Sequence, residues 1–405
     1  EIPLPPEPHQ HGDDEHAQVA PKTMRLRLHH VISHGPRLDG LLRSARMVTT
    51  PVFDTETAAA LQPLFGDAPL FTLITDVGYG GSVSGSLRSP AVDSSKAGGD
   101  NAGPPTRLKW AGIDSNYSLA GGHLLFRLDA PGLDLSGDAA TAGTIGPIVI
   151  SADLRQIEHG PLWIGNSALS VASMAFKAGD TGLRLDQLEI LSDTREEAGL
   201  MNSGVQFTAA KIEASDLKLD QLRLHLALDH VNAVAASELS QAMNRYQQEH
   251  GKDPAAADPA AMAAALKPAL GKLAAGHPEF RIDELSFTSP EGALKVDGLL
   301  RYIGDDKLED FSPLTDVEGK LQIDAPLSTL NLMLSQKLRS DMAQSAGVPP
   351  DEVPPEVIAS MLASTRDGLV KQGLLNVDGD RGSSRIAFQA GVLTINGKAL
   401  GAPAP

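Results

Sequence analysis

An eight-residue pattern of apolar side chains occurs three times in this chain, at residues 183–190, 217–224 and 280–287. The copies read Leu-Arg-Leu-Asp-Gln-Leu-Glu-Ile, Leu-Lys-Leu-Asp-Gln-Leu-Arg-Leu and, more loosely, Phe-Arg-Ile-Asp-Glu-Leu-Ser-Phe. On either side of the Asp-Gln or Asp-Glu dipeptide, apolar and polar residues alternate as in a strand with one wet face. The dipeptide shifts this alternation by one residue, which would turn the strand over unless a β-bulge absorbs the shift. We therefore expect three long, bent strands, each with a bulge at the dipeptide.

Alternation typical of strands also occurs before and after these copies. Glycines such as those at residues 78–81 and 121–122 mark turns between the alternating segments. Asn396-Gly397 is the strongest short turn signal in the chain and predicts a hairpin. The pattern predicts strands at residues 24–29, 70–77, 82–87, 108–113, 124–128 and 145–150, and again at 374–377, 384–389 and 392–395.

Four segments have apolar residues at helical spacing instead. The first runs over residues 232–249. The second opens at Asp258-Pro259, an N-cap followed by proline at the first helical position, and contains Pro268 as an expected kink. The other two cover residues 328–347 and 355–371. The helical segments therefore occur in two neighbouring couples between strands.

These patterns predict an α+β fold, dominated by a mostly antiparallel, twisted and curved sheet with two inserted helical pairs. A chain of 405 residues can bury a core of that size without disulfides. The expected order is a disordered spacer at 1–23, a β-rich region at 24–231, a helical insertion at 232–276, strands at 277–327, a helical pair at 328–372 and a closing meander at 373–400.

The charge and residue content restrict the partners. A net charge of −17 repels polyanions, so nucleic acid is not expected as a partner. The chain contains no cysteine, which excludes disulfides and thiol chemistry. No stretch approaches 18 apolar residues, so no helix of this chain is expected to span a membrane. The chain starts at Glu1 instead of Met, and we expect that a signal peptide or an anchor helix was removed.

A His-Gly-Pro tripeptide follows an apolar strand segment at two places, and the chain closes with a strand that ends in Asn-Gly. These features resemble the YdgA-like family, a family of bacterial proteins of unknown function. The resemblance implies a periplasmic protein held to the inner membrane by an N-terminal helix, and it brings no catalytic residues. The residues that carry it are His34, Gly35, Pro36, His159, Gly160, Pro161, Asn396 and Gly397.

No motif for catalysis, metal binding or cofactor binding is present. Adjacent His29 and His30 on a strand would point to opposite faces and could not share a metal ion without distortion. The His-Gly-Pro tripeptides are interpreted as turns, because no nucleophile elbow accompanies them. The sequence also lacks a phosphate-binding loop and a dinucleotide fingerprint. We therefore predict a protein that is not an enzyme and that has no cofactor and no metal.

The remaining function is binding or support of the bacterial envelope. Long bent strands with one apolar face can curl into a trough for a lipid or another hydrophobic ligand, although the same residues could form an ordinary core. One alternative is a scaffold for envelope proteins or a homo-oligomer formed through apolar helices. Another is a hydrolase with an unrecognised site. The residues expected to line a hydrophobic groove are Leu183, Leu185, Leu217, Leu219, Leu222 and Leu224.

Overall fold

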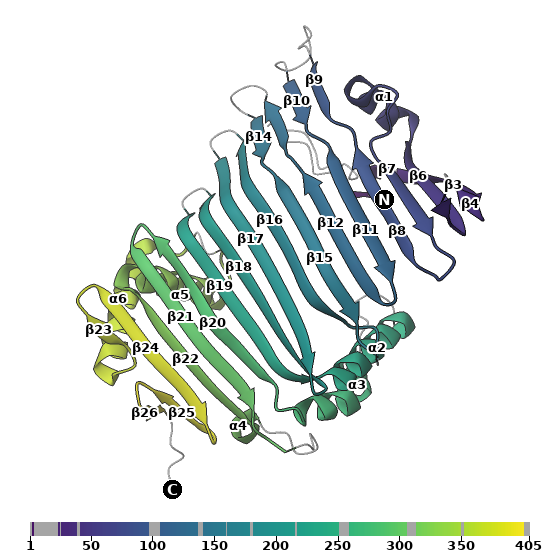
Figure 1. Cartoon of the computed structure of the whole chain (residues 1–405). Helices are drawn as coiled ribbons and strands as arrows, with labels where there is room; N and C mark the ends of the chain where they lie inside the picture. The colour runs from purple at the N-terminus through teal and green to yellow at the C-terminus, as the bar shows by residue number, and fades with distance from the viewer. Residues whose placement is uncertain are drawn as a thin grey trace. The chain divides into compact units, whose positions relative to one another are not determined.

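A computed structural model describes residues 2–3, 23–24, 26–38, 41–96, 106–136, 141–158, 160–178, 181–214, 217–250, 259–305, 313–349 and 352–400. The chain forms two compact units, and each is mostly antiparallel sheet (Figure 1). Unit 1 comprises residues 1–153 and 171–182, and unit 2 comprises residues 154–170 and 183–405. The predicted α+β class with a dominant antiparallel sheet is confirmed. Most of the spacer predicted at 1–23 lies outside the described residues.

Unit 1 is built from antiparallel strands, several of which pair with a strand that is not their neighbour in the chain. Two-residue strands β1 (Ile2–Pro3) and β2 (Thr23–Met24) pair with each other, as do β4 (Arg37–Leu38) and β5 (Leu41–Leu42). The main strands are β3 (Leu26–His34), β6 (Ala45–Phe53), β7 (Thr72–Val77), β8 (Val83–Ser89), β9 (Val92–Lys96), β10 (Thr106–Trp110), β11 (Ile113–Ala120), β12 (His123–Ala130), β13 (Leu133–Ser136), β14 (Thr141–Ile145) and β15 (Ile148–Gln156). The next strand, β16 (Trp163–Ala178), runs from unit 2 into unit 1.

Two strands predicted in this unit are interrupted. The segment predicted at 108–113 is divided between β10 and β11 at Gly112, where φ is +88° and a Cβ atom would lie 2.7 Å from the Ser89 carbonyl oxygen. The segment predicted at 145–150 is divided between β14 and β15 at Gly146-Pro147, because proline has no N–H for the ladder. A helix that the sequence patterns did not predict, α1 (Thr55–Phe65), follows Asp54, whose carboxylate accepts a hydrogen bond from the Thr57 N–H at 2.8 Å.

Unit 2 is a meander of longer strands. Neighbours pair in the order β17–β18–β19–β20–β21–β22–β24–β25–β26, and β23 pairs with β24. The strands are β17 (Thr181–Glu197), β18 (Leu200–Ala214), β19 (Leu217–Asn232), β20 (Glu279–Ser289), β21 (Gly292–Tyr302), β22 (Val317–Pro326), β23 (Asn376–Asp378), β24 (Arg381–Gln389), β25 (Val392–Ile395) and β26 (Lys398–Leu400).

Two of the three predicted bulges are present where the repeated dipeptide occurs. In β19 the register with β20 shifts between Asp220 and Arg223, and Gln221 has a positive φ of +55°. In β20 the register with β21 shifts between Ile282 and Leu285. In β17 Gln187 has a φ of +51°, but the register with β18 continues from Asp186 to Glu189 without a shift. In β19 the left-handed Gln221 lets the strand change its alternation without turning its apolar side chains to the other face.

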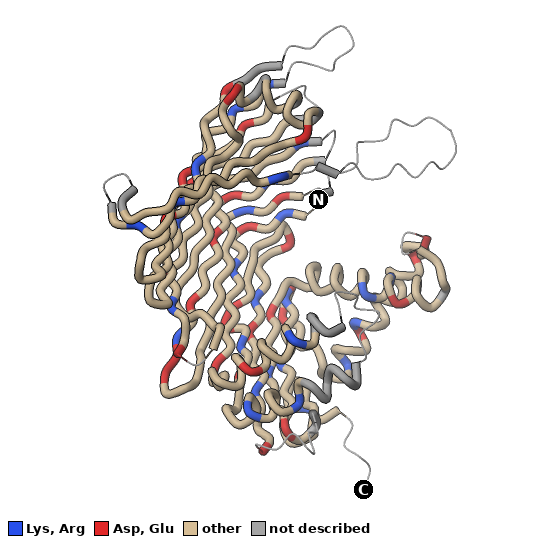
Figure 2. Tube along the Cα trace, turned by 90° about the vertical axis from the view of Figure 1, so that its right-hand side faces the viewer, with Lys and Arg blue, Asp and Glu red and all other residues tan. Residues whose placement is uncertain are grey.

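The helices of unit 2 lie on one side of its strands (Figure 2). The helix α3 begins at Pro259, as its sequence signal predicts. Ala343 on α5 and Ile358 on α6 form a buried cluster with Val353 between them. The helices are α2 (Ala233–His250), α3 (Pro259–Ala274), α4 (Pro313–Asp316), α5 (Leu327–Ala346) and α6 (Pro355–Gln372).

Candidate functional site

One face of the unit 2 sheet carries apolar side chains in rows that cross the strands. The strand register places residues from successive strands directly opposite one another, so each row runs perpendicular to the strands. We define the outer row as Leu228, Phe280, Leu300, Gly319, Phe388 and Leu393. We define the inner row as Leu226, Ile282, Gly298, Leu321, Ile386 and Ile395. These rows extend from β19 to β25 (Figure 1).

Helix α5 covers the part of this face that lies beyond the inner row. A Cβ atom on Gly382 of β24 would lie 2.6 Å from the Cδ1 atom of Leu330 and 3.1 Å from the Cδ2 atom of Leu327, so α5 packs closely on this strand. Beneath this part of the face, Leu294 is only 3% exposed and Ala325 is fully buried. The covered end of the face is therefore an ordinary core.

The outer row has no comparable cover among the described residues. Leu300, on the same strand and face as Leu294, is 51% exposed, and its neighbours Leu228 and Phe280 are 43% and 40% exposed. A groove of about 290 Å³ lies over the two rows, and its lining is almost wholly apolar. The residues that line it are Phe280, Ile282, Gly298, Leu299, Leu300, Gly319, Lys320, Leu321, Ile386 and Phe388.

Two glycines set the floor of the groove. Leu321 reaches toward Gly298, where a Cβ atom would be 3.1 Å from the leucine Cδ1, and Leu300 reaches toward Gly319, at 3.5 Å. Neither glycine has a positive φ. Glycine weakens a strand, and the backbone conformation at these two positions does not require it. The role of the two glycines is therefore that they have no side chain. Each one leaves room for a leucine to lie low on the sheet.

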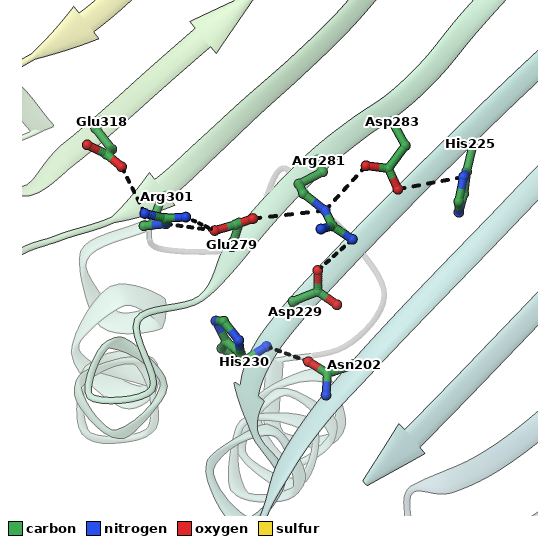
Figure 3. A network of polar contacts seen from close by, with 9 residues as sticks. All are labelled: Asn202, His225, Asp229, His230, Glu279, Arg281, Asp283, Arg301 and Glu318. Atoms are coloured by element: carbon green, nitrogen blue, oxygen red, sulfur yellow. Dashed lines mark hydrogen bonds and ion pairs between the residues drawn. The ribbon is translucent and has the colours of Figure 1, made fainter. Parts of the chain in front are cut away.

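The opposite face of the same strands carries charged side chains (Figure 3). The buried carboxylate of Glu279 accepts hydrogen bonds from Arg301 at 2.6 Å, and Arg301 also contacts Glu318 at 3.2 Å. These bonds raise the pKa of the Arg301 guanidinium, chiefly through the hydrogen bond that it donates to Glu279. Arg281 pairs with Asp229 at 3.0 Å and Asp283 at 3.3 Å.

This polar network distinguishes the charged face of the sheet from the apolar face. Asp283 lies 3.6 Å from the His225 ring and so extends the network to β19, while a separate hydrogen bond of 3.0 Å runs from the His230 N–H to the Asn202 side chain (Figure 3). A slip of one residue in any of these strands would bury charges and expose the apolar rows. The charged face therefore fixes the register that builds the groove.

The six groove residues predicted from the repeat lie in two separate parts of the sheet. Leu222 and Leu224 precede Leu226 and Leu228 on β19 at the alternate positions of one face, and they are half-buried. The first parts of the first two copies meet across β18, where Ala214 lies between Leu183 and Leu217, and Ile212 between Leu185 and Leu219. None of these six lines the groove over the outer row. The third copy does so, through Phe280 and Ile282.

The rest of the groove was missed because its residues lie outside the repeat. The sequence does carry a signal for the two glycines. Val296-Asp-Gly-Leu-Leu300 and Val317-Glu-Gly-Lys-Leu321 share the order valine, acid, glycine, any residue, leucine. In each copy the glycine stands at an apolar position of the alternation, so the shared pattern indicates a gap in the apolar face.

The His-Gly-Pro tripeptides are close-packed turns where the structure describes them. Gly35 donates its N–H to Ser44 O at 2.9 Å, and a Cβ atom there would fall on the Arg43 carbonyl oxygen. Pro36 accepts a hydrogen bond from the Arg43 N–H at 3.2 Å. His34 is exposed. In this copy the glycine is required because another segment of backbone occupies the place of its side chain.

In the second copy, the segment that lies close to the glycine is a helix. His159 lies outside the described residues. A Cβ atom on Gly160 would be 2.6 Å from the Cβ atom of Ser237, a buried residue of α2. Just past Pro161, the Leu162 carbonyl accepts a hydrogen bond from the Ile157 N–H at 3.1 Å and closes the turn. The second tripeptide thus joins the start of β16 to α2.

The closing Asn-Gly turn also has a structural role. Asn396 has a φ of +51° and Gly397 a φ of +78°, as the hairpin turn requires. The Asn396 side chain accepts a hydrogen bond from the Arg385 N–H at 2.9 Å and donates one to Gly373 O at 3.0 Å, at the C-terminus of α6. It therefore ties the last hairpin to the helix that precedes it.

Among the described residues, the structure has neither a metal-binding cluster nor a membrane-spanning helix. No group of three or more His, Asp or Glu side chains in the described ranges is placed to hold a metal ion. His30 instead contacts the Thr49 hydroxyl at 2.8 Å. Within the same ranges, no helix combines the length and the apolar character needed to cross a membrane.

The fold and the groove define a β-rich protein with one charged and one apolar sheet face. The chain belongs to a family described as "Bacterial protein of unknown function (DUF945)", whose model matches residues 10–402. This family includes the YdgA-like proteins, so the resemblance seen in the motifs is confirmed. No curated protein and no solved structure matches the chain.

Proposed function

We propose that this protein is a non-catalytic binding protein of the bacterial envelope, which holds the hydrocarbon part of a lipid or another hydrophobic ligand in the groove of unit 2. The observation that carries the proposal is the contrast along β21, where Leu294 is buried under α5 and Leu300 is half exposed on the same face. A contiguous exposed apolar patch on a folded protein marks a place where something else binds. In this proposal the helical segments 232–276 and 328–372 are two pairs, and α5 of the second pair covers the part of the sheet face beyond the groove.

The size of the groove suits part of a hydrocarbon chain. A volume of about 290 Å³ accommodates about ten groups of about 30 Å³ each, the share of one water molecule in the liquid. Each buried methylene contributes about 0.8 kcal/mol, so a chain of that length gains about 8 kcal/mol before the cost of association.

We propose a periplasmic location on the basis of the family resemblance. The motifs resemble those of proteins held to the inner membrane on its periplasmic side. A periplasmic protein with an apolar groove would meet lipids that leave or enter the membrane. Native mass spectrometry of protein purified from bacterial periplasm, followed by organic extraction, should find a lipid bound in a stoichiometric amount. A clean apo mass would count against the proposal.

Leu300→Glu should lower the affinity for a fluorescent polyene fatty acid, cis-parinaric acid, by about a hundredfold. The bound chain would strip water from the new carboxylate, which costs several kcal/mol, and about 2.7 kcal/mol corresponds to a hundredfold. The free energy of unfolding should change little, because Leu300 is half exposed. Fluorescence titration gives the affinity, and urea unfolding gives the stability.

Lys295→Gln is the matched control for this variant. It changes the net charge by the same single unit, and it lies on the exposed, opposite face of the same strand. Parinarate should bind to this variant as it binds to the unchanged protein. Undiminished binding to Leu300→Glu would remove the groove as the ligand site.

A second candidate function is a scaffold for envelope proteins or for a homo-oligomer. The observation in its favour is the exposure of Leu332 and Met333 on α5, at 54% and 56%. Sedimentation velocity separates the two functions. A defined oligomer that is lost in Leu332→Glu, together with no parinarate binding, would favour the scaffold.

A further inference from the structure

The exposed apolar strip is long across the strands and short along them. Along β21 it ends at Leu294, which lies under α5 in one direction. In the other direction it ends at Tyr302, whose ring stacks on His277 with the ring centroids 6.2 Å apart and whose hydroxyl donates to Asp305 O at 2.6 Å. Across the strands the outer row continues from Leu228 to Leu393 without a polar side chain.

The strip is long enough for one extended acyl chain, and it is narrow. From β19 to β25 the outer row crosses five strand-to-strand steps of about 4.8 Å, a length of about 24 Å. A single acyl chain spans one leaflet, which is about 15 Å or half of the bilayer's hydrocarbon core. Each row is only about 7 Å wide, which is the rise of two strand residues. The strip therefore accommodates an extended chain better than a broad, fused-ring molecule.

One end of the outer row changes from apolar to polar. The strand register continues the row from Leu228 to Ser203 on β18 and from there to Thr194 on β17. The two hydroxyls lie 3.1 Å apart and are half-buried, so both side chains are on the apolar face. Hydroxyl groups can donate or accept hydrogen bonds, which the almost wholly apolar groove cannot provide.

We infer that the ligand is a single long, unbranched acyl chain that lies across the strands along the outer row, with its polar head group beside Thr194 and Ser203. This inference rests on the proposed function and adds the class of ligand, its direction and the position of its head group. The chain crosses Gly319, where the missing side chain lets Leu300 lie flat beneath it. The inner row, half-buried, forms the side of the strip that faces α5.

The direction can be measured with stearic acid that carries a nitroxide near either its carboxyl group or its terminal methyl group. Paramagnetic broadening is recorded on methyl-labelled leucine and valine residues of the full chain. The label near the carboxyl group should broaden Leu228 and Val205, which is next to Ser203 on the same face. The label near the methyl end should broaden Leu300 and the methyls farther along the row toward Leu393.

The outcomes separate this inference from the function on which it rests. If stearate binds and either label broadens Leu294 or Leu330, the chain lies along the strands, so the inference fails and the proposed function stands. If both labels broaden the two ends of the row equally, the position of the head group is wrong. If stearate does not bind at all, the proposed function fails as well.

A glycine variant provides an independent test of the path. Gly319→Val should lower the affinity for stearate about tenfold, because the new side chain lifts Leu300 into the strip, an overpacking effect of about the size known for cores. The control is Gly204→Val on β18, where a Cβ atom would meet Asp193 Oδ1 at 3.6 Å, as it would meet Leu300 Cδ1 at 3.5 Å at Gly319. Equal affinities in the two variants would overturn the path across Gly319.

Discussion

Replacing Leu294 with alanine should lower the free energy of unfolding by about 2–5 kcal/mol, because the side chain is 3% exposed beneath α5 and its loss leaves a cavity. Leu300→Ala, on the same strand and the same face, should lower it by less than about 1 kcal/mol, since half of that side chain already meets solvent. Urea unfolding of the two variants side by side measures the difference.

The same two variants should behave in the opposite way toward a ligand. Leu300→Ala removes a groove wall, so it should weaken parinarate binding, whereas Leu294→Ala should leave the groove intact at temperatures where the variant is folded. The pair therefore tests whether one face of one strand is divided into a core and a binding surface. Equal unfolding costs for the two leucines would contradict that division.

Gly160→Ala should destabilise the protein by about 1–3 kcal/mol, although its backbone conformation suits alanine. The reason is steric, because the added Cβ atom would lie 2.6 Å from the Cβ atom of buried Ser237 on α2. The helix and the turn must then move apart. Urea unfolding, with the helical signal followed by circular dichroism, measures the loss.

A double variant identifies the cause. Ser237→Gly removes the opposing Cβ atom and by itself costs about 1 kcal/mol, as glycine does inside a helix. If the clash is the cause, Gly160→Ala should be nearly neutral in the Ser237→Gly background, with a coupling energy of about 1 kcal/mol or more between the two sites. Additive effects would show that Gly160 acts through something other than contact with α2.

The parts of the fold that local periodicity encodes could be predicted. The bulges in β19 and β20 follow from the phase shift at a repeated dipeptide, and α3 begins at the proline that its sequence marks. Helix α1 was missed because its segment is short and lies between strand patterns. The strand breaks at Gly112 and Pro147 were missed because the alternation of apolar and polar residues continues through both. Pro147 breaks the ladder because it lacks an N–H, whereas at Gly112 the close Ser89 backbone shows why the strand is interrupted.

The groove could be predicted in kind but not in place. An apolar strand face appears in the sequence, and the third copy of the repeat does supply Phe280 and Ile282. Which rows stay open depends on where α5 lies and on which residues face each other across β20, β21, β22 and β24. Both are properties of the tertiary structure. Leu294 and Leu300 occupy equivalent positions in the alternation of β21, and nothing local to that strand distinguishes the buried one from the exposed one.

The connection between β22 and β24 determines when the groove exists at all. These strands pair directly, yet the chain makes α5, α6 and β23 between them. Closing so long a connection costs more chain entropy than joining two strands by a tight turn. A nascent chain that ends at Gln372 already contains the covering helices but lacks Ile386 and Phe388. The protein therefore has no complete surface for a hydrophobic molecule until its last strands have been synthesised and have paired.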